Sequence, residues 1–290
     1  MGGIIQRITE FIKEMLQGWV SSNLEAMFTY VNERTGAIAG EVGRTPETWN
    51  AGIFYTVKSL SEDVVIPIAG FVITFVLCYE LISMVMDKNN MHDFDSGMFF
   101  RYLMKACIAV VLVSNTFDIT MAVFDVGNYL IVSAGEQITG STSINVQETI
   151  AAMAGGQMEN MGIGELVGLG METMIVRFIM EIMALLITVI LYGRMVEIYL
   201  YISVAPIPFA TWTNREWGSV GTNYFKGLVA MAFQGFFIMV CVAVYAALVS
   251  GISVAANLHS ALWEVAGYTV LLSFCLLKTG SLSRSIFNAH

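Results

Sequence analysis

The sequence predicts an all-α, multi-pass membrane protein with about five transmembrane helices and additional amphipathic helices at the N-terminus. Apolar residues make up 56% of the 290 residues and charged residues only 13%, and the mean hydropathy is +0.69. This composition lies outside the range of ordinary soluble domains. The chain also lacks the alternating ten-residue segments, separated by turn residues, that build a membrane β-barrel.

The N-terminal segment, 1–62, is predicted to form amphipathic helices outside the membrane core. Apolar residues such as Ile4 and Ile8 recur at helical spacing, while charged residues occupy the other face. A second helix is expected to begin with Thr45 as its N-cap and Pro46 at its first position. Two arrangements fit this pattern: the helices lie on the bilayer or on a partner, or they pack on their own bundle.

Five apolar regions approach the 20 or so residues that a helix needs to cross the hydrocarbon core. The first two lie in the segment 63–117, and Ser61-Glu62-Asp63 is expected to cap the first of them. The five predicted spans are 64–86, 98–117, 174–196, 226–249 and 262–279.

The segment 118–173 is rich in glycine and acidic residues and is predicted to lie outside the cell. From residue 106 to residue 176 there is no Lys or Arg, whereas seven acidic residues occur there. Because basic residues concentrate in cytoplasmic loops, this segment is expected outside and the C-terminus inside. Five spans then place the N-terminus outside. Within this segment, Ile119–Val132 is expected to form a surface helix.

The remaining region, 174–290, contains three predicted spans and the charged residues of greatest interest. Arg177 and Glu181 are four residues apart, and Arg194 and Glu197 are three apart, so each pair shares one helix face. Such intramembrane charges form an ion or proton pathway, or they are paired anchors near the ends of a long helix.

Two further features of this region bear on helix packing. Pro206 and Pro208 cannot continue a regular helix, so a broken or re-entrant segment is expected there. Ala243, Ala247 and Gly251 form a ridge of small residues at four-residue spacing, which allows close helix approach within the chain or between copies.

No motif of an enzyme is present, and no cofactor or metal site is predicted. The three histidines are isolated, the four cysteines lack CxxC spacing, and GxSxG is absent. The net charge of −9, from 14 basic and 23 acidic residues, argues against a surface that neutralises phosphates, and thus against sequence-specific nucleic acid binding.

The stretch RMVEIYLYISVAPIPFA, residues 194–210, resembles the TrbL-like polytopic proteins of conjugative type IV secretion systems. The segments 217–227 and 233–235 add to the likeness, which covers about 170–285 and is closest to the version on mobile genetic elements of Gram-positive bacteria. The resemblance implies a channel or platform subunit of the cytoplasmic membrane with about five spans, an external N-terminus and an internal C-terminus.

The resemblance further implies a cyclic homo-oligomer that assembles with other conjugation proteins around the route of a relaxase-linked single strand of DNA. Partner ATPases would supply the energy, since no nucleotide-hydrolysing motif is present. Acids such as Glu159 and Glu165 would keep DNA from adhering to the lumen. The alternatives are an ion or small-solute transporter that uses the two Arg/Glu pairs, and an adaptor that anchors partners through its N-terminal helices.

Overall fold

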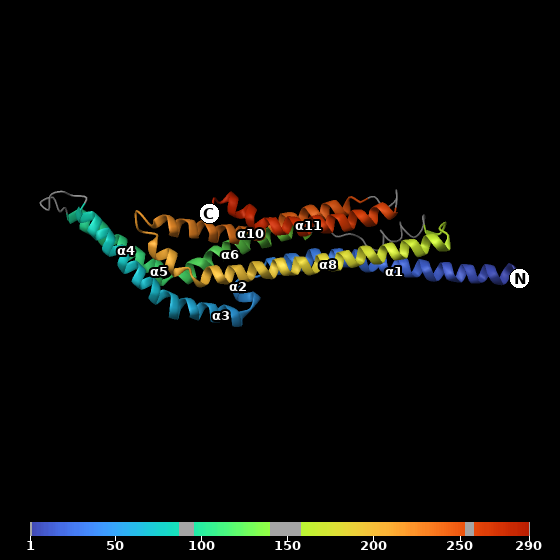
Figure 1. The fold of residues 1–290 in the computed structure, drawn as a ribbon, viewed down its shortest axis with the longest axis horizontal. Coiled ribbons are helices and arrows are strands. Elements are labelled where there is room, and N and C mark those ends of the chain that lie inside the picture. The colour runs from blue at the N-terminus through green and yellow to red at the C-terminus, as the bar shows by residue number, and fades with distance from the viewer. Residues whose placement is uncertain (1, 87–95, 140–157, 253–257, 290) are drawn as a thin grey trace. The chain divides into compact units, whose positions relative to one another are not determined.

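The computed structural model describes residues 2–86, 96–139, 158–252 and 258–289, and within these ranges every regular element is a helix (Figure 1). The all-α, multi-pass fold class that the sequence predicts is therefore confirmed. The elements are α1 (Gly2–Val42), α2 (Pro46–Trp49), α3 (Ala51–Leu60), the π-helix η1 (Ser61–Val65), α4 (Ile66–Met86), α5 (Ser96–Ser114), α6 (Thr116–Thr139), α8 (Ile163–Ser203), α9 (Pro206–Thr211), α10 (Gly218–Ser250) and α11 (Leu258–Ile286).

The chain forms two compact units, each assembled from three separate stretches. The first unit comprises Met1–Val42, Val132–Leu191 and Ile238–Lys278. The second comprises Gly43–Ile131, Tyr192–Phe237 and Thr279–His290. Both units are therefore built from residues that lie far apart in the sequence.

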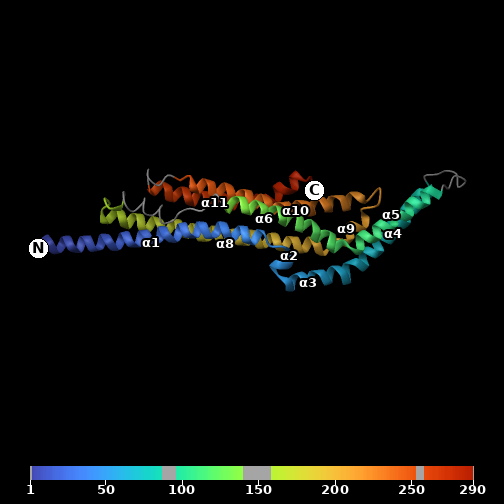
Figure 2. The same cartoon turned by 180° about the vertical axis from the view of Figure 1, so that it is seen from behind.

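In the first unit, α1 runs parallel to α8, and the partners are offset by about 150 residues throughout. Asn23 donates to the Thr173 hydroxyl at 3.4 Å, and the Tyr30 hydroxyl donates to the Met180 carbonyl at 3.3 Å. Figure 2 shows the two helices from behind. The buried side chains of α1 begin at Val20 and Leu24, so the later part of this helix packs on the chain itself, whereas Ile4 and Ile8 of the predicted apolar stripe are 69% and 54% exposed.

The second N-terminal helix begins as predicted but is much shorter. Thr45 caps α2 in a capping box with Thr48, and Pro46 is its first residue. Asn50 then adopts an extended conformation, ends α2, and caps α3 by accepting from the Ile53 N–H at 3.0 Å. The sequence did not reveal that α3 starts separately, because the apolar residues keep their helical spacing on both sides of Asn50.

The predicted cap at Ser61-Glu62-Asp63 is wrong. The chain passes from α3 into α4 without a break, through the wider turn of η1, and Ser61 has ordinary helical φ and ψ. An N-cap requires an extended backbone, which a continuous helix does not provide. The apolar helix around the first predicted span consequently extends from Ala51 to Met86.

Among the described residues, six helices are long and apolar enough to cross a membrane, one more than predicted. The additional one is Thr116–Glu136, where a surface helix was expected. Its three acids, Asp118, Asp125 and Glu136, belong to the acidic segment that the sequence places outside the membrane. Phe117, Phe124 and Ile131 are buried, whereas Val126 and Tyr129 are exposed, so the helix has apolar residues on both its packed and its open side.

The helices α5 and α6 are separated only by Asn115, and helical hydrogen bonding continues through it. The Asn115 N–H donates to the Val111 carbonyl at 3.1 Å, and the Ile119 N–H donates to the Asn115 carbonyl at 3.0 Å. Two antiparallel helices need a connecting loop of about 2–5 residues. Since Asn115 alone cannot reverse the chain, α5 and α6 do not form an antiparallel hairpin.

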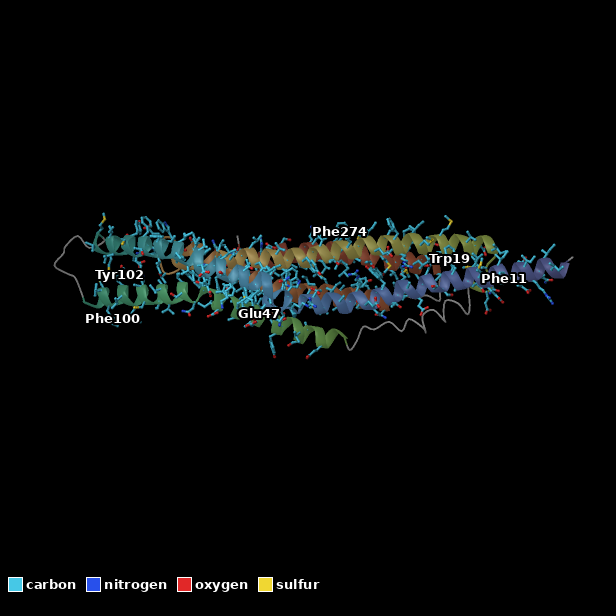
Figure 3. The ribbon with its side chains drawn as sticks, turned by 90° about the horizontal axis from the view of Figure 1, so that it is seen from below. Phe11, Trp19, Glu47, Phe100, Tyr102 and Phe274 are labelled. Carbon is cyan, nitrogen blue, oxygen red and sulfur yellow. The ribbon has the colours of Figure 1, made fainter. Side chains whose placement is uncertain are left out.

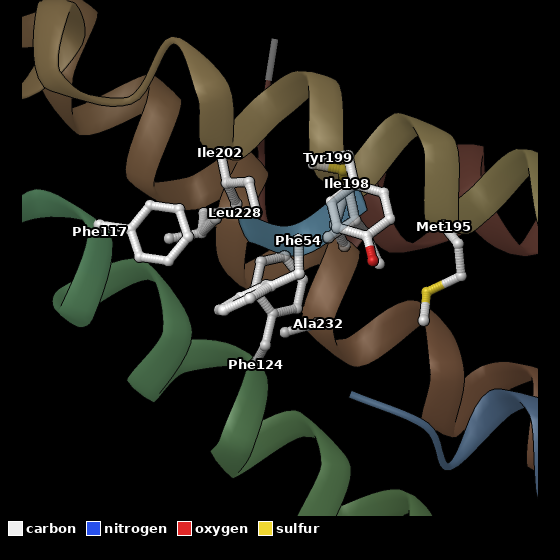
Figure 4. Close-up of a cluster of buried hydrophobic side chains, with 10 residues drawn as sticks. Phe54, Phe117, Phe124, Met195, Ile198, Tyr199, Ile202, Leu228 and Ala232 are labelled. Carbon is white, nitrogen blue, oxygen red and sulfur yellow. The ribbon is translucent and has the colours of Figure 1, made fainter. Parts of the chain in front are cut away.

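The core of the second unit brings together α3, α6, α8 and α10, as Figure 4 shows. Phe54 and Phe117 meet edge to face with their ring centroids 5.4 Å apart. Where α6 crosses α10, a Cβ added at Gly127 would lie 2.9 Å from both the Cβ and the carbonyl oxygen of Ala232. Glycine therefore permits a helix contact that any side chain would obstruct. The buried residues are Phe54, Phe117, Phe124, Met195, Ile198, Tyr199, Ile202, Leu228, Met231 and Ala232.

A second cluster of this unit holds α9 against the hairpin of α4 and α5. Phe209 of α9 is fully buried, together with Ala69 of α4 and Ala109 of α5. The outer faces of the hairpin remain apolar: Phe71 is 79% exposed and Phe100 is 62% exposed. Figure 3 labels Phe100, with Phe11 and Phe274 of other helices, among the exposed aromatic side chains. An exposed surface of this kind suits contact with lipid rather than with water.

Candidate functional site: the charged and broken region of α8 to α11

The first charge pair lies in the first unit and forms an exposed ion pair. Arg177 Nε is 3.2 Å from Glu181 Oε1, and about half of each side chain is exposed. Tyr30 of α1 lines a small cavity of about 60 Å³ with both residues, and Arg34 donates to its hydroxyl at 3.0 Å. Burial raises the pKa of Tyr30 above its usual value, although Arg34 acts in the opposite direction. The pair therefore lies on the seam between α1 and α8.

Arg194 belongs to the second unit and is the least satisfied charge in the described part of the chain. Only 7% of the residue is exposed, and its Nε has no hydrogen-bond partner. A Cβ added at Gly235 would come within 2.9 Å of its Nη2, so the guanidinium packs directly on the backbone of α10. A buried guanidinium without an anionic partner costs several kcal/mol.

Glu197 pairs with Arg284 of α11, not with Arg194. The sequence spacing could not reveal this, because Arg284 lies 87 residues away. Both side chains are about half exposed. They line a cavity of about 240 Å³ together with Gln234, whose amide donates to the Thr279 hydroxyl at 3.4 Å. Thus an interhelical ion pair connects α8 to α11, while Arg194 stays apart from it.

The chain is interrupted at the two prolines. The helix α8 ends at Ser203, and the short helix α9 begins at Pro206 and contains Pro208. Two tyrosines close this region by reciprocal bonds: Tyr224 donates to the Tyr201 carbonyl at 2.7 Å, and Tyr201 donates to the Tyr224 carbonyl at 3.3 Å. Their rings stack with centroids 4.5 Å apart. These contacts between Tyr201 and Tyr224 hold the start of α10 against the end of α8.

The ridge of small residues lies on the open side of α10. Ala247 and Gly251 are exposed and Ala243 is half-buried, whereas Tyr245 and Val249 face the interior of the first unit. A Cβ added at Gly251 would contact only its own helix. Of the two packing arrangements considered, the structure leaves this ridge available to a neighbouring copy.

A polar cluster that sequence analysis missed joins the hairpin to the segment before α10. Glu80 pairs with Lys105 and accepts from the Asn214 amide at 3.3 Å. Tyr79 donates to Glu216 at 2.7 Å. The opposite charges of Glu80 and Lys105, which lie on two consecutive apolar segments of the sequence, were an available signal. Nothing in the sequence pointed to Asn214.

Of the predicted external segment, residues 140–157 lie outside the described residues, and the rest is helical or close to a helix start. Glu165 accepts from the Gly162 N–H at 2.8 Å and so caps α8. Glu159 is exposed. Within the described ranges, no group of three or more His, Cys, Asp or Glu side chains is placed to hold a metal ion.

Residues 31–206 match the family model described as TrbL/VirB6 plasmid conjugal transfer like protein. The match begins within α1 and ends at Pro206, whereas the motif resemblance covered about 170–285; the two share the region of Arg177, Glu181, Arg194 and Glu197. No curated protein and no solved structure matches the chain. Because the match covers more than half of the chain, the protein belongs to the TrbL/VirB6 plasmid conjugal transfer-like family, a family of membrane components of conjugative type IV secretion.

Proposed function

We propose that the protein is a channel or platform subunit of a conjugative machine in the cytoplasmic membrane, and that several copies surround the route of relaxase-linked single-stranded DNA. The family match over residues 31–206 carries this proposal. Other conjugation proteins, including ATPases, would dock on the subunit and drive transfer.

The proposed topology has five crossings, an external N-terminus and an internal C-terminus. Six helices of the described ranges qualify as spans by length and composition, but α5 and α6 continue through Asn115 and are counted as one crossing. An odd number of crossings places the termini on opposite sides, and the distribution of Lys and Arg favours an internal C-terminus.

Single cysteines at Glu159 and at Ser285, in a variant without the four native cysteines, test this topology with a membrane-impermeant maleimide. Labelling of position 159 in intact cells, and of position 285 only after lysis, is expected; the reverse would refute the topology.

Exposed small residues support assembly of copies. Because Ala247 is exposed on α10 and Gly251 is exposed directly after its last residue, they allow close approach by another helix. Replacing Ala247 with Leu is expected to reduce the mass of the complex purified in mild detergent. Leu at Ala246, which is buried, controls for general loss of folding. A monomeric wild-type protein would contradict the ring.

Whether DNA passes along this protein can be tested by replacing an acidic residue of the segment proposed to lie outside. Glu159 is a better position than Glu165, because substitution of Glu165 also removes the cap of α8. Glu159→Lys is expected to lower transfer while membrane insertion is unchanged, since a basic lumen would retain the strand. A photo-crosslinking residue at position 159 should capture the transferred strand during mating. Unchanged transfer together with absence of captured DNA would exclude this position from the route.

Arg194 is the observation that favours a transporter of ions or small solutes instead, because a buried unpaired charge in a membrane protein often marks a pathway. A transporter would lose solute flux in proteoliposomes when Arg194 is replaced by Gln. The conjugation proposal predicts no specific flux in either protein.

A further inference from the structure

An open cavity of about 700 Å³ lies in the second unit, between the α4–α5 hairpin and the segment that leads into α10. It is separate from the ion pair of Glu197 and Arg284. One part of its lining is polar and the other is apolar and rich in methionine. The lining residues are Tyr79, Glu80, Ile82, Ser83, Met84, Met86, Met98, Lys105, Asn214, Arg215 and Glu216.

The polar wall is held in place by a buried asparagine. Asn214 is only 5% exposed, and its amide donates to Glu80. Its carbonyl oxygen accepts from the N–H groups of Glu216 and Trp217, at 2.8 and 2.9 Å. Because Glu80 also binds Lys105, its carboxylate is already occupied. The wall is thus preorganised, and its shape does not depend on a ligand.

The wall nevertheless retains one cation that has no partner within the described residues. Arg215 is exposed and makes neither a hydrogen bond nor an ion pair there. The neighbouring acid, Glu216, accepts from the Tyr79 hydroxyl at 2.7 Å. The helix α10 starts three residues further on and has no acid in its first turn to offset its positive end. The polar wall therefore presents Arg215 to an anion.

The apolar part of the cavity has the character of a lipid contact. Met86 is 73% exposed and Ile82 is exposed beside it. Methionine side chains adapt to flexible apolar ligands. Next to the cavity, Trp217 stacks with both Phe75 and Tyr79 of α4, with centroid distances of 5.3 and 5.6 Å. Such Trp and Tyr side chains mark the depth of lipid headgroups.

We propose that this cavity binds one anionic phospholipid, with its phosphate against Arg215 and an acyl chain along Met84, Met86 and Met98. An anionic headgroup is favoured because Lys105 balances the charge of Glu80 and the Glu216 carboxylate is held toward the Tyr79 hydroxyl, whereas Arg215 has no ion-pair partner among the described residues. A lipid is favoured over a protein segment because the hairpin around the cavity exposes apolar side chains that only a bilayer would surround. The site does not depend on the role of the protein in DNA transfer.

The test uses the full chain, delipidated in detergent and titrated with phosphatidylglycerol or phosphatidylcholine, with bound lipid counted by native mass spectrometry. Arg215→Ala should weaken phosphatidylglycerol retention about fivefold, the usual effect of one basic residue near an anionic headgroup. Arg101→Ala is the matched control, since Arg101 is exposed on α5 and does not line the cavity. Met98→Trp should lower retention of both lipids by filling the apolar part.

Three outcomes would overturn the proposal. They are equal losses in the Arg215→Ala and Arg101→Ala proteins, equal retention of the two lipids by the wild-type protein, and unchanged retention in Met98→Trp. Glycerol phosphate, the headgroup without acyl chains, is titrated in parallel. Binding of glycerol phosphate as tightly as the lipid, with the same dependence on Arg215, would assign the site to a soluble anion instead.

Discussion

Replacing Gly127 with Ala tests whether close approach of α6 and α10 stabilises the second unit. The new Cβ would lie 2.9 Å from the Ala232 carbonyl oxygen and 3.1 Å from its carbonyl carbon, which are backbone atoms and cannot move without displacing a helix. Overpacking of this kind costs about 1–3 kcal/mol. Against this, Ala in place of Gly in a helix gains about 1 kcal/mol.

Gly70→Ala on α4 provides the matched control, because a Cβ there meets nothing within 4 Å. Gly70→Ala should gain the stability that Ala has over Gly in a helix, about 1 kcal/mol, without a steric clash. The free energies of unfolding of the two variants should therefore differ by about 1–3 kcal/mol, with Gly127→Ala the less stable. Reversible denaturation in detergent, followed by circular dichroism, measures both. The reasoning is refuted if Gly127→Ala is as stable as Gly70→Ala.

Three further predictions concern charged residues. Arg194→Met should leave the folded protein as stable or raise its unfolding free energy by about 1–4 kcal/mol, because an apolar side chain replaces a buried unpaired charge; a large loss of stability in the same assay would reveal a missed partner. A double-mutant cycle over Glu197→Gln and Arg284→Gln should give a coupling of at most about 1 kcal/mol, since both groups are half exposed, and a larger value would indicate a buried pair. Glu165→Gln should be nearly neutral in thermal denaturation, because an amide oxygen can also accept from the Gly162 N–H, whereas Glu165→Ala should cost about 0.5–2 kcal/mol; equal stability of the two variants would rule out a capping role.

The fold class and the helix-breaking prolines could be read from the sequence because composition and proline chemistry act locally. The extent of each helix could not. The cap predicted at Ser61 failed because its residue types also fit a π-helical turn inside one long helix. The missed sixth candidate helix, α6, has acids on its exposed side and phenylalanines on its buried side, and only the tertiary contacts separate these faces.

The partners of the charges were predictable only when they lay on the same helix. The spacing of Arg177 and Glu181 gave a pair that the structure contains. The same spacing argument joined Glu197 to Arg194, but the side chain of Glu197 pairs with Arg284 from another helix. Sequence spacing carries no information about a contact that depends on how α8 and α11 pack. The family match also cannot supply this contact, because it ends at Pro206.

The uninterrupted hydrogen bonding at Asn115 affects how the orientation of the chain should be mapped. A reporter enzyme inserted at this position would split one continuous helix. The disrupted protein would then report the wrong side of the membrane for this position. The Asn115 side chain donates to the Val111 carbonyl at 2.8 Å, a bond that the helix can lose without breaking. Single-residue labels are therefore the suitable markers at this position, and enzyme fusions belong beyond the ends of the helices.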